Sequence, residues 1–191
     1  MTKPTQDQAE RAVRTLLDFI DDDPAREGLE DTPARVVKSY AEIFAGYTQD
    51  PAAVLGTTFG ECESYSQMIL LTGIKLQSTC EHHMLPFNGE AAVAYIPRER
   101  VVGISKLARL VEVYSRRLQI QEKLTEQVAD ALHEHLDPLG VGVLMKAHHA
   151  CMGCRGVRHE NARMTTTALR GEFLTDAAVR AEFLSAALSH K

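Results

Sequence analysis

Residues 101–132, VVGISKLARLVEVYSRRLQIQEKLTEQVADAL, decide the fold of this chain. Apolar side chains recur there three and four positions apart, which predicts two consecutive helices over residues 105–117 and 119–136. Pro138 and Gly140 then end the second helix. The apolar stripe of that helix consists of Ile120, Leu124, Val128, Ala131 and Leu132. We therefore expect a pair of helices in the middle of the sequence.

Strand-like segments flank this helical pair on both sides. Residues 66–77 and 90–96 precede it, and residues 141–151 and 163–170 follow it. Two strands, two helices and two more strands favour an antiparallel sheet with the helices on one face. The predicted fold class is therefore α+β.

Further helices are expected at the two ends of the chain. Residues 5–20 have helical periodicity, and a second helix opens at Thr32, which we expect as the N-cap, with Pro33 at the first helical position and Gly46 as the stop. An alanine-rich helix is expected over residues 175–188. These patterns divide the chain into an N-terminal helical segment at 1–60, an α+β domain at 61–174 and a C-terminal helical tail at 175–191.

The composition describes a globular protein of ordinary content. The 191 residues are 45% hydrophobic and 25% charged, with a formal net charge of −5. This charge argues against nucleic acid or an anionic membrane as a partner, although a small phosphorylated ligand can still bind a local cationic pocket. Apolar stretches are far shorter than the about 20 residues needed to span a bilayer, and the N-terminus does not resemble a signal peptide. We expect a cytoplasmic protein.

Two short segments contain the residue types that bind zinc. One is Cys80-Glu81-His82-His83, in which Cys-x-x-His can place a thiolate and an imidazole on one metal. The other is residues 148–156, HHACMGCRG. Cysteine and histidine together favour zinc over calcium or magnesium, which prefer oxygen ligands.

The second segment has a face preference if its strand stays extended to the end. His149 and Cys151 then point to one face of the sheet, and His148 points to the other. The alternation therefore predicts that His149 and Cys151 act together, whereas His148 packs elsewhere.

Two kinds of zinc site are compatible with these residues. A closed structural site would use Cys80, His83, Cys151 and Cys154, whereas an open site would use three of these ligands and a water molecule. Spacing does not separate them, and the number of available ligands favours the closed site. Two spare histidines, His82 and His149, favour the open one, because a hydrolytic metal site needs groups that move protons.

Cationic residues gather at one expected helix start. Ser105, Lys106 and Arg109 could bind phosphate there, since helix N-termini offer free N–H groups. The alternative is a solvated helix surface. Arg35 and Lys38 are likewise three apart on the second expected helix, which opens at Thr32, where surface charges are the ordinary interpretation.

Gln121 and Glu122 begin the next helix. Glu122 could complement the helix dipole, or it could be a buried carboxylate that accepts hydrogen bonds from a heterocycle.

Several long motifs resemble the GTP cyclohydrolase I family. They are STCEHHMLPFNGEAAVAYIP at 78–97, the stretch at 101–132, HHACMGCRGVR at 148–158, MTTTALRGEF at 164–173 and DTPARVVKSYAEIFAGY at 31–47. The resemblance covers roughly residues 8–173.

This resemblance implies a fold, an assembly and a reaction. The fold would be the tunnelling fold, with a four-stranded antiparallel sheet and two helices per subunit. The assembly would be a homodecamer of two pentameric barrels, with sites at subunit junctions. The reaction would be the zinc-dependent hydrolysis and rearrangement of GTP to 7,8-dihydroneopterin triphosphate and formate, the first step of pterin and folate biosynthesis.

The resemblance also implies roles for single residues. Cys80, His83 and Cys151 match the zinc ligands, with one position left for water. His149 and His82 match the histidines near the imidazole ring of the purine, where they would move protons.

The remaining matched residues would hold the substrate. Glu122, next to Gln121, matches the carboxylate that pairs with the N–H edge of guanine. The positions gathered around the triphosphate and ribose are Ser105, Lys106, Arg109, Arg155, Arg35 and Lys38. The ribose rearrangement would take place near Ser105.

Cys154 departs from the family pattern, because it is an extra thiol beside the metal residues. A zinc-stabilised non-enzymatic module, with four protein ligands, is one rival interpretation. A tunnelling-fold relative that acts on another purine or pterin is a second.

Overall fold

The computed structural model describes residues 2–56, 58–60 and 67–189 and divides into two compact units, Met1–Ala45 and Gly46–Lys191. Residues 61–66 lie outside the described residues, and they include Cys62 and the first residue of the expected strand 66–77. The expected domain boundary after residue 60 adjoins them.

The first unit consists of α1 (Gln6–Phe19) and α2 (Thr32–Ile43). Thr5 caps α1 in a reciprocal pair with Gln8. The expected cap of α2 was wrong by one residue, because the N-cap is Asp31, whose side chain makes no capping hydrogen bond. Pro33 is therefore at the second helical position rather than the first, still within the first turn, and is the only buried residue among the described positions 2–45.

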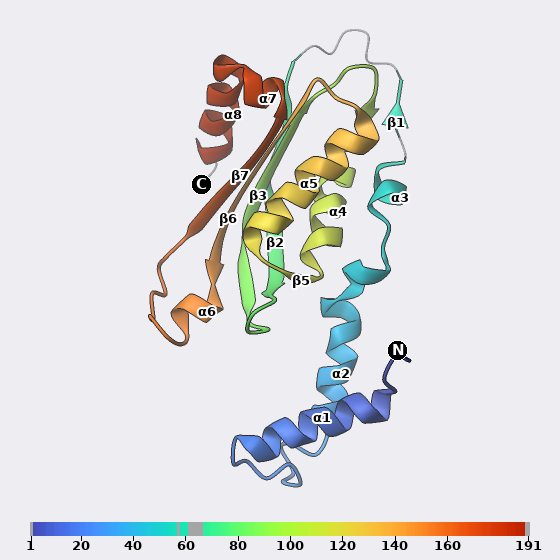
Figure 1. Ribbon diagram of the computed structural model, residues 1–191, viewed down its shortest axis with the longest axis vertical. Coiled ribbons are helices and arrows are strands. Elements are labelled where there is room, and N and C mark those ends of the chain that lie inside the picture. The colour runs from blue at the N-terminus through green and yellow to red at the C-terminus, as the bar shows by residue number, and fades with distance from the viewer. Residues whose placement is uncertain (1, 57, 61–66, 190–191) are drawn as a thin grey trace. The chain divides into compact units, whose positions relative to one another are not determined.

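The second unit is built on one mixed sheet (Figure 1). Its four long strands pair antiparallel in the order β2 (Ile69–Cys80), β3 (Pro86–Ile96), β6 (Gly140–His149) and β7 (Met164–Gly171). Both α4 (Ile104–Ser115) and α5 (Gln121–Leu136) fall between β3 and β6 in the sequence. This arrangement confirms the α+β class and the order of strands and helices. A short edge strand, β5 (Leu118–Gln119), which was not predicted, pairs parallel with the end of β2.

Side chains alternate between two faces of this sheet. On the first, which we call the α4–α5 face, buried side chains such as Val93, Val143 and Met145 join those of both helices in one core cluster. On the second, which we call the α8 face, Ala94 and Leu144 pack with Phe183 of α8 (Ala177–Ser189). Figure 1 shows α8 and the α4–α5 pair on opposite sides of the sheet. Each strand therefore contributes to two separate environments.

Short elements complete the described chain. They are η1 (Ala45–Thr48), α3 (Pro51–Leu55), β1 (Thr58–Phe59), β4 (Val101–Val102), α6 (Ala150–Gly153) and α7 (Glu172–Thr175). No helix within the described residues has the length and apolar content to cross a membrane.

Candidate metal centre

Three predicted ligands meet at one end of the sheet. Cys80 ends β2, His83 lies in the turn after it, and Cys151 lies in α6. Their candidate ligand atoms all lie within 4.8 Å of one another, and they form the only such group of Cys, His, Asp or Glu side chains among the described residues. Cys80 is buried, Cys151 is half-buried and His83 is exposed. The group is therefore open to solvent on the histidine side.

A tight turn brings Cys80 and His83 together. The Met84 N–H donates to the Cys80 carbonyl at 2.8 Å, and the Cys80 N–H donates to the Leu85 carbonyl at 2.8 Å. Met84 has a φ of 54°, in the left-handed region, which lets the chain reverse within so few residues. As a result His83 Nδ1 lies 4.0 Å and His82 Nδ1 lies 3.9 Å from Cys80 Sγ.

Cys151 reaches the group by a route that the sequence did not predict. The strand does not stay extended through residue 151, because β6 ends at His149 and α6 begins at Ala150. Alternation still holds for the two histidines, which lie on opposite faces of the sheet. Cys151 joins the site through a helical turn rather than through strand periodicity.

Two cysteine sulfurs lie close together in this group, and a cation bound between them would stabilise both. Burial raises the pKa of the Cys151 thiol, and the neighbouring Cys80 raises it further. The Cys80 sulfur thus disfavours ionisation of the Cys151 thiol, and a metal bound between them would offset that effect. Cys154 is exposed and does not belong to the ligand group found among the described residues. The geometry thus favours the three-residue site over the closed four-residue one.

His149 is held on two sides. Its ring stacks on Phe87 with centroids 4.6 Å apart and planes 10° apart, and its Nε2 lies 2.9 Å from Gln121 Oε1. Burial lowers the pKa of His149, while the charge of Glu122 acts in the opposite direction. Phe87 was not identified from the sequence, although strand alternation places it on the same face as the α4–α5 core.

The start of α5 is fixed beside Cys80. Strand β5 pairs Gln119 with Cys80, and the Glu81 N–H donates to the Gln119 carbonyl at 2.9 Å. Gln121 is fully buried and hydrogen-bonded at both ends of its amide, so its side chain exposes no atom to a ligand. Glu122 is exposed in the first turn of α5, which fits dipole complementation and not the buried carboxylate.

The other predicted residues near the metal group are exposed. His82 and Arg155 both lie at the surface. Arg155 Nη1 lies 3.0 Å from His83 Nε2, so one cation of the predicted substrate set touches a candidate ligand directly.

The residues that were expected to bind phosphate lie at the beginning of α4, the end of that helix farther from β5 and Cys80. Ser105 and Arg109 are exposed and Lys106 is half-buried at the beginning of α4. That helix runs about 15 Å from Ser105 to its end at Ser115, and only then does the chain enter β5 beside Cys80. Ser105, Lys106 and Arg109 therefore lie towards the end of α4 that is farther along the chain from β5 and Cys80.

The two cations of the first unit are also exposed. Arg35 pairs with Asp31 at 2.9 Å across one turn of α2, and Lys38 lies one turn further on.

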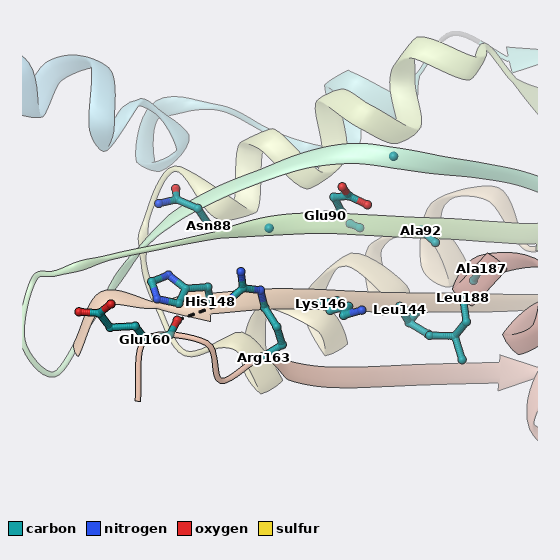
Figure 2. Close-up of a pocket in the computed structure, with 13 residues that line it drawn as sticks. Asn88, Glu90, Ala92, Leu144, Lys146, His148, Glu160, Arg163, Ala187 and Leu188 are labelled. Carbon is teal, nitrogen blue, oxygen red and sulfur yellow. Dashed lines mark hydrogen bonds between the residues drawn. The ribbon is translucent and has the colours of Figure 1, made fainter. Parts of the chain in front are cut away.

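A hollow of about 580 Å³ lies on the α8 face of the sheet (Figure 2). Asn88, Glu90, Lys146 and His148 line it from the strands, and Arg163 and the carbonyl of Glu160 meet beside them at 3.5 Å. His148 therefore belongs to a different environment from His149, as the alternation predicted.

Fold and site together define a tunnelling-fold protein with a Cys-His-Cys group that could bind a metal. The sequence profile of GTP cyclohydrolase I matches residues 9–188. The chain belongs to the GTP cyclohydrolase I family.

Proteins similar to this chain carry the same family name. GTP cyclohydrolase 1 of Maricaulis maris (strain MCS10) is 52% identical over 183 residues, covering 96% of this chain and 89% of the relative. GTP cyclohydrolase 1 of Rickettsia typhi (strain ATCC VR-144 / Wilmington) is 51% identical and covers 97% of each chain. The solved structure of an archaeosine synthase QueF-Like in the apo form aligns with a TM-score of 0.47 and 22% identity, over 57% of this chain and 97% of that one. That last likeness decides neither fold nor function.

Proposed function

We propose that this protein is a zinc-dependent hydrolase that converts GTP to 7,8-dihydroneopterin triphosphate and formate, at the start of pterin and folate biosynthesis in the cytoplasm. The observation that carries this proposal is the group of Cys80, His83 and Cys151 in a chain of the GTP cyclohydrolase I family. A three-residue ligand set is what a catalytic zinc site requires, since four protein ligands would leave no position for water or substrate.

The residues present fit zinc. Two cysteine sulfurs and one imidazole form a donor set that zinc prefers. A zinc ion at this place would supply a Lewis acid that makes water a nucleophile near neutral pH.

The neighbouring side chains supply proton transfer and base selection. His149, held by Phe87 and Gln121, is proposed to protonate a purine ring nitrogen as the imidazole ring opens, with His82 as a second proton carrier. Glu122 is proposed to accept hydrogen bonds from the N–H edge of guanine. Adenine lacks that donor pattern, so in a subunit junction that covers Glu122 it would leave the carboxylate without donors and would be rejected.

One hydroxyl residue and five cationic residues are proposed to hold the triphosphate and ribose across a subunit junction. They are Ser105, Lys106, Arg109, Arg155, Arg35 and Lys38. The separation of α4's beginning from Cys80 within one chain supports such a shared site, because a substrate held at both places would require a second copy. We therefore propose a homo-oligomer, a decamer of two pentamers, with GTP bound between subunits.

Turnover tests the proposed reaction. Protein of measured zinc content is incubated with GTP, and formate and a pterin chromophore are followed, with ATP as the control nucleotide. We expect both products from GTP and neither from ATP, and loss of both after chelation. Zinc-replete protein that releases no formate would contradict the proposal and favour the non-enzymatic zinc module. Turnover of another purine or pterin would favour the related enzyme.

Subunit mixing tests the shared site. Cys151→Ser and Lys106→Ala variants are each expected to be nearly inactive alone, and their co-expression should restore part of the activity. Restoration is expected because some junctions then combine an intact metal group with an intact cation cluster. Inactive mixtures, from subunits shown to co-assemble, would place both halves of the site within one chain.

A further inference from the structure

Gln121 is a buried amide whose nitrogen and oxygen both have hydrogen-bond partners. Its side chain is fully buried at the start of α5. The two hydrogens of the amide nitrogen Nε2 are shared among three acceptors, the carbonyl oxygens of Met145 and Met164 and the Thr166 hydroxyl, each at 3.1 Å. Its Oε1 faces His149 Nε2 at 2.9 Å. The amide therefore links two sheet strands to one histidine.

The orientation of this amide is fixed by its partners. Backbone carbonyl oxygens can only accept hydrogen bonds, so the amine must face Met145 and Met164. Turning the amide over would place Oε1 against both carbonyl oxygens and leave these buried acceptors without a donor, which destabilises that orientation.

The two neighbouring threonines agree with this orientation. Thr125 Oγ1 donates to the Gln121 carbonyl at 2.7 Å. The 2.7 Å contact between the Thr125 and Thr166 hydroxyls then takes its hydrogen from Thr166. The Thr166 oxygen is thus left to accept from the Gln121 amine, as its position requires.

This arrangement decides which nitrogen of His149 carries a hydrogen. An acceptor oxygen at 2.9 Å requires an N–H on Nε2. The bond forms equally with a neutral or a protonated ring, because Nε2 carries hydrogen in both. No hydrogen bond made by the described residues uses Nδ1, and the stacked Phe87 fixes the plane of the ring. Nδ1 is therefore the ring nitrogen left without a partner among the described residues, and it is the one that can face a substrate.

We propose that Gln121 is a positioning residue that holds His149 as the Nε2–H form and presents Nδ1 to the substrate, rather than a residue that touches GTP with its side chain. The kinetic part of this inference rests on the proposed function. The form of the ring can be measured without any substrate.

Solid-state ¹⁵N NMR of the histidine-labelled, zinc-loaded full chain tests the ring directly. His149 is assigned by the signals lost in His149→Ala. In the neutral ring we expect a protonated Nε2 and an unprotonated Nδ1. The opposite pattern, or a mixture, would overturn the proposal whether or not GTP is turned over. The expected pattern in a protein that releases no formate would keep it and reject the proposed reaction alone.

Gln121→Met tests the consequence, because methionine fills the space but cannot accept from Nε2. We expect a mixture of both ring forms, and a kcat lower by about 10- to 100-fold, as for loss of an orienting partner, with KM for GTP changed less than about 3-fold. The matched control is Thr125→Val, which leaves the amide in place and should change kcat less than about 3-fold. A raised KM with unchanged kcat would show that Gln121 binds the substrate and would overturn the proposal. The measurement on the unsubstituted protein decides the ring form if the Met variant does not fold.

Discussion

The two faces of the central sheet place adjacent residues of one strand in different chemical environments. On the α4–α5 face, His149 stacks on Phe87 and bonds to buried Gln121. On the α8 face, His148 borders an open hollow with Glu90 and Lys146 (Figure 2). Both histidines end β6, and the alternation of side chains along the strand separates them.

The difference lies in what covers each face. Two helices cover the first face, and their buried side chains hold polar groups in one orientation. The second is covered at one end by α8, and its charged residues remain exposed to water. Fixed groups suit catalysis because they need not be reordered during the reaction. The following changes test this contrast.

The largest effect is expected from the metal group. Cys151→Ser removes one of three ligands, so zinc content should fall and GTP turnover should drop by more than about 100-fold, beyond the usual cost of losing an orienting partner. Metal analysis and formate release measure the two effects. Cys154→Ser is the control, because this exposed thiol lies outside the group, and its zinc content and activity should stay normal. Zinc loss in the Cys154→Ser variant would show that Cys154 is a ligand and would favour the closed four-ligand site.

The adjacent histidines provide the second comparison. His149→Ala should keep zinc but lower kcat by about 10²- to 10⁴-fold, the usual contribution of a general acid or base. His148→Ala should change kcat less than about 3-fold, since its side chain borders the hollow on the α8 face. Steady-state kinetics with GTP measure both variants. Equal losses of kcat in the His149→Ala and His148→Ala variants would mean that the two faces of the sheet are not functionally distinct.

Packing provides the third comparison. Leu132→Ala on α5 removes a fully buried side chain from the α4–α5 core, so the free energy of unfolding should fall by about 2–5 kcal/mol. Lys146→Ala removes an exposed side chain on the α8 face that lies across from Glu90. Its cost should stay below about 1 kcal/mol. Chemical denaturation measures both, and a larger loss in the lysine variant would contradict the contrast.

The smallest effect is expected at the edge of the α4–α5 face. Arg170 of β7 pairs with Glu126 and Asp130 of α5, and all three side chains are partly exposed. Arg170→Ala should therefore lower the free energy of unfolding by about 1 kcal/mol or less. The difference from the unsubstituted protein should shrink in about 1 M salt, where charges are screened. A difference that does not depend on salt would assign the loss to packing.

Local sequence patterns were sufficient to predict the helices and strands and the types of residue that form the site. The helices over 105–117 and 119–136 were predicted because apolar periodicity is a property of neighbouring positions. Predicted ends were less accurate, as at β3, which begins at Pro86 rather than residue 90. The cysteines and histidines could be recognised because few other side chains bind zinc.

Positions far apart in the sequence could be related only by the folded chain. The parallel pairing of Cys80 with Gln119 brings the start of α5 to the metal group, and a two-residue strand gives almost no periodic signal. The helical turn after His149 moves Cys151 off the strand, which alternation could not foresee. The bond between Gln121 and His149 spans 28 positions.

The sequence by itself determined the α+β class, the order of its elements and the set of residues able to bind a metal, because these depend on local periodicity and side-chain chemistry. Only the tertiary structure decided that Cys154 stays outside the group, that Phe87 stacks on His149, and that Gln121 faces a histidine rather than solvent. Those outcomes depend on strand pairing and helix packing, which set distances between residues that the sequence does not relate.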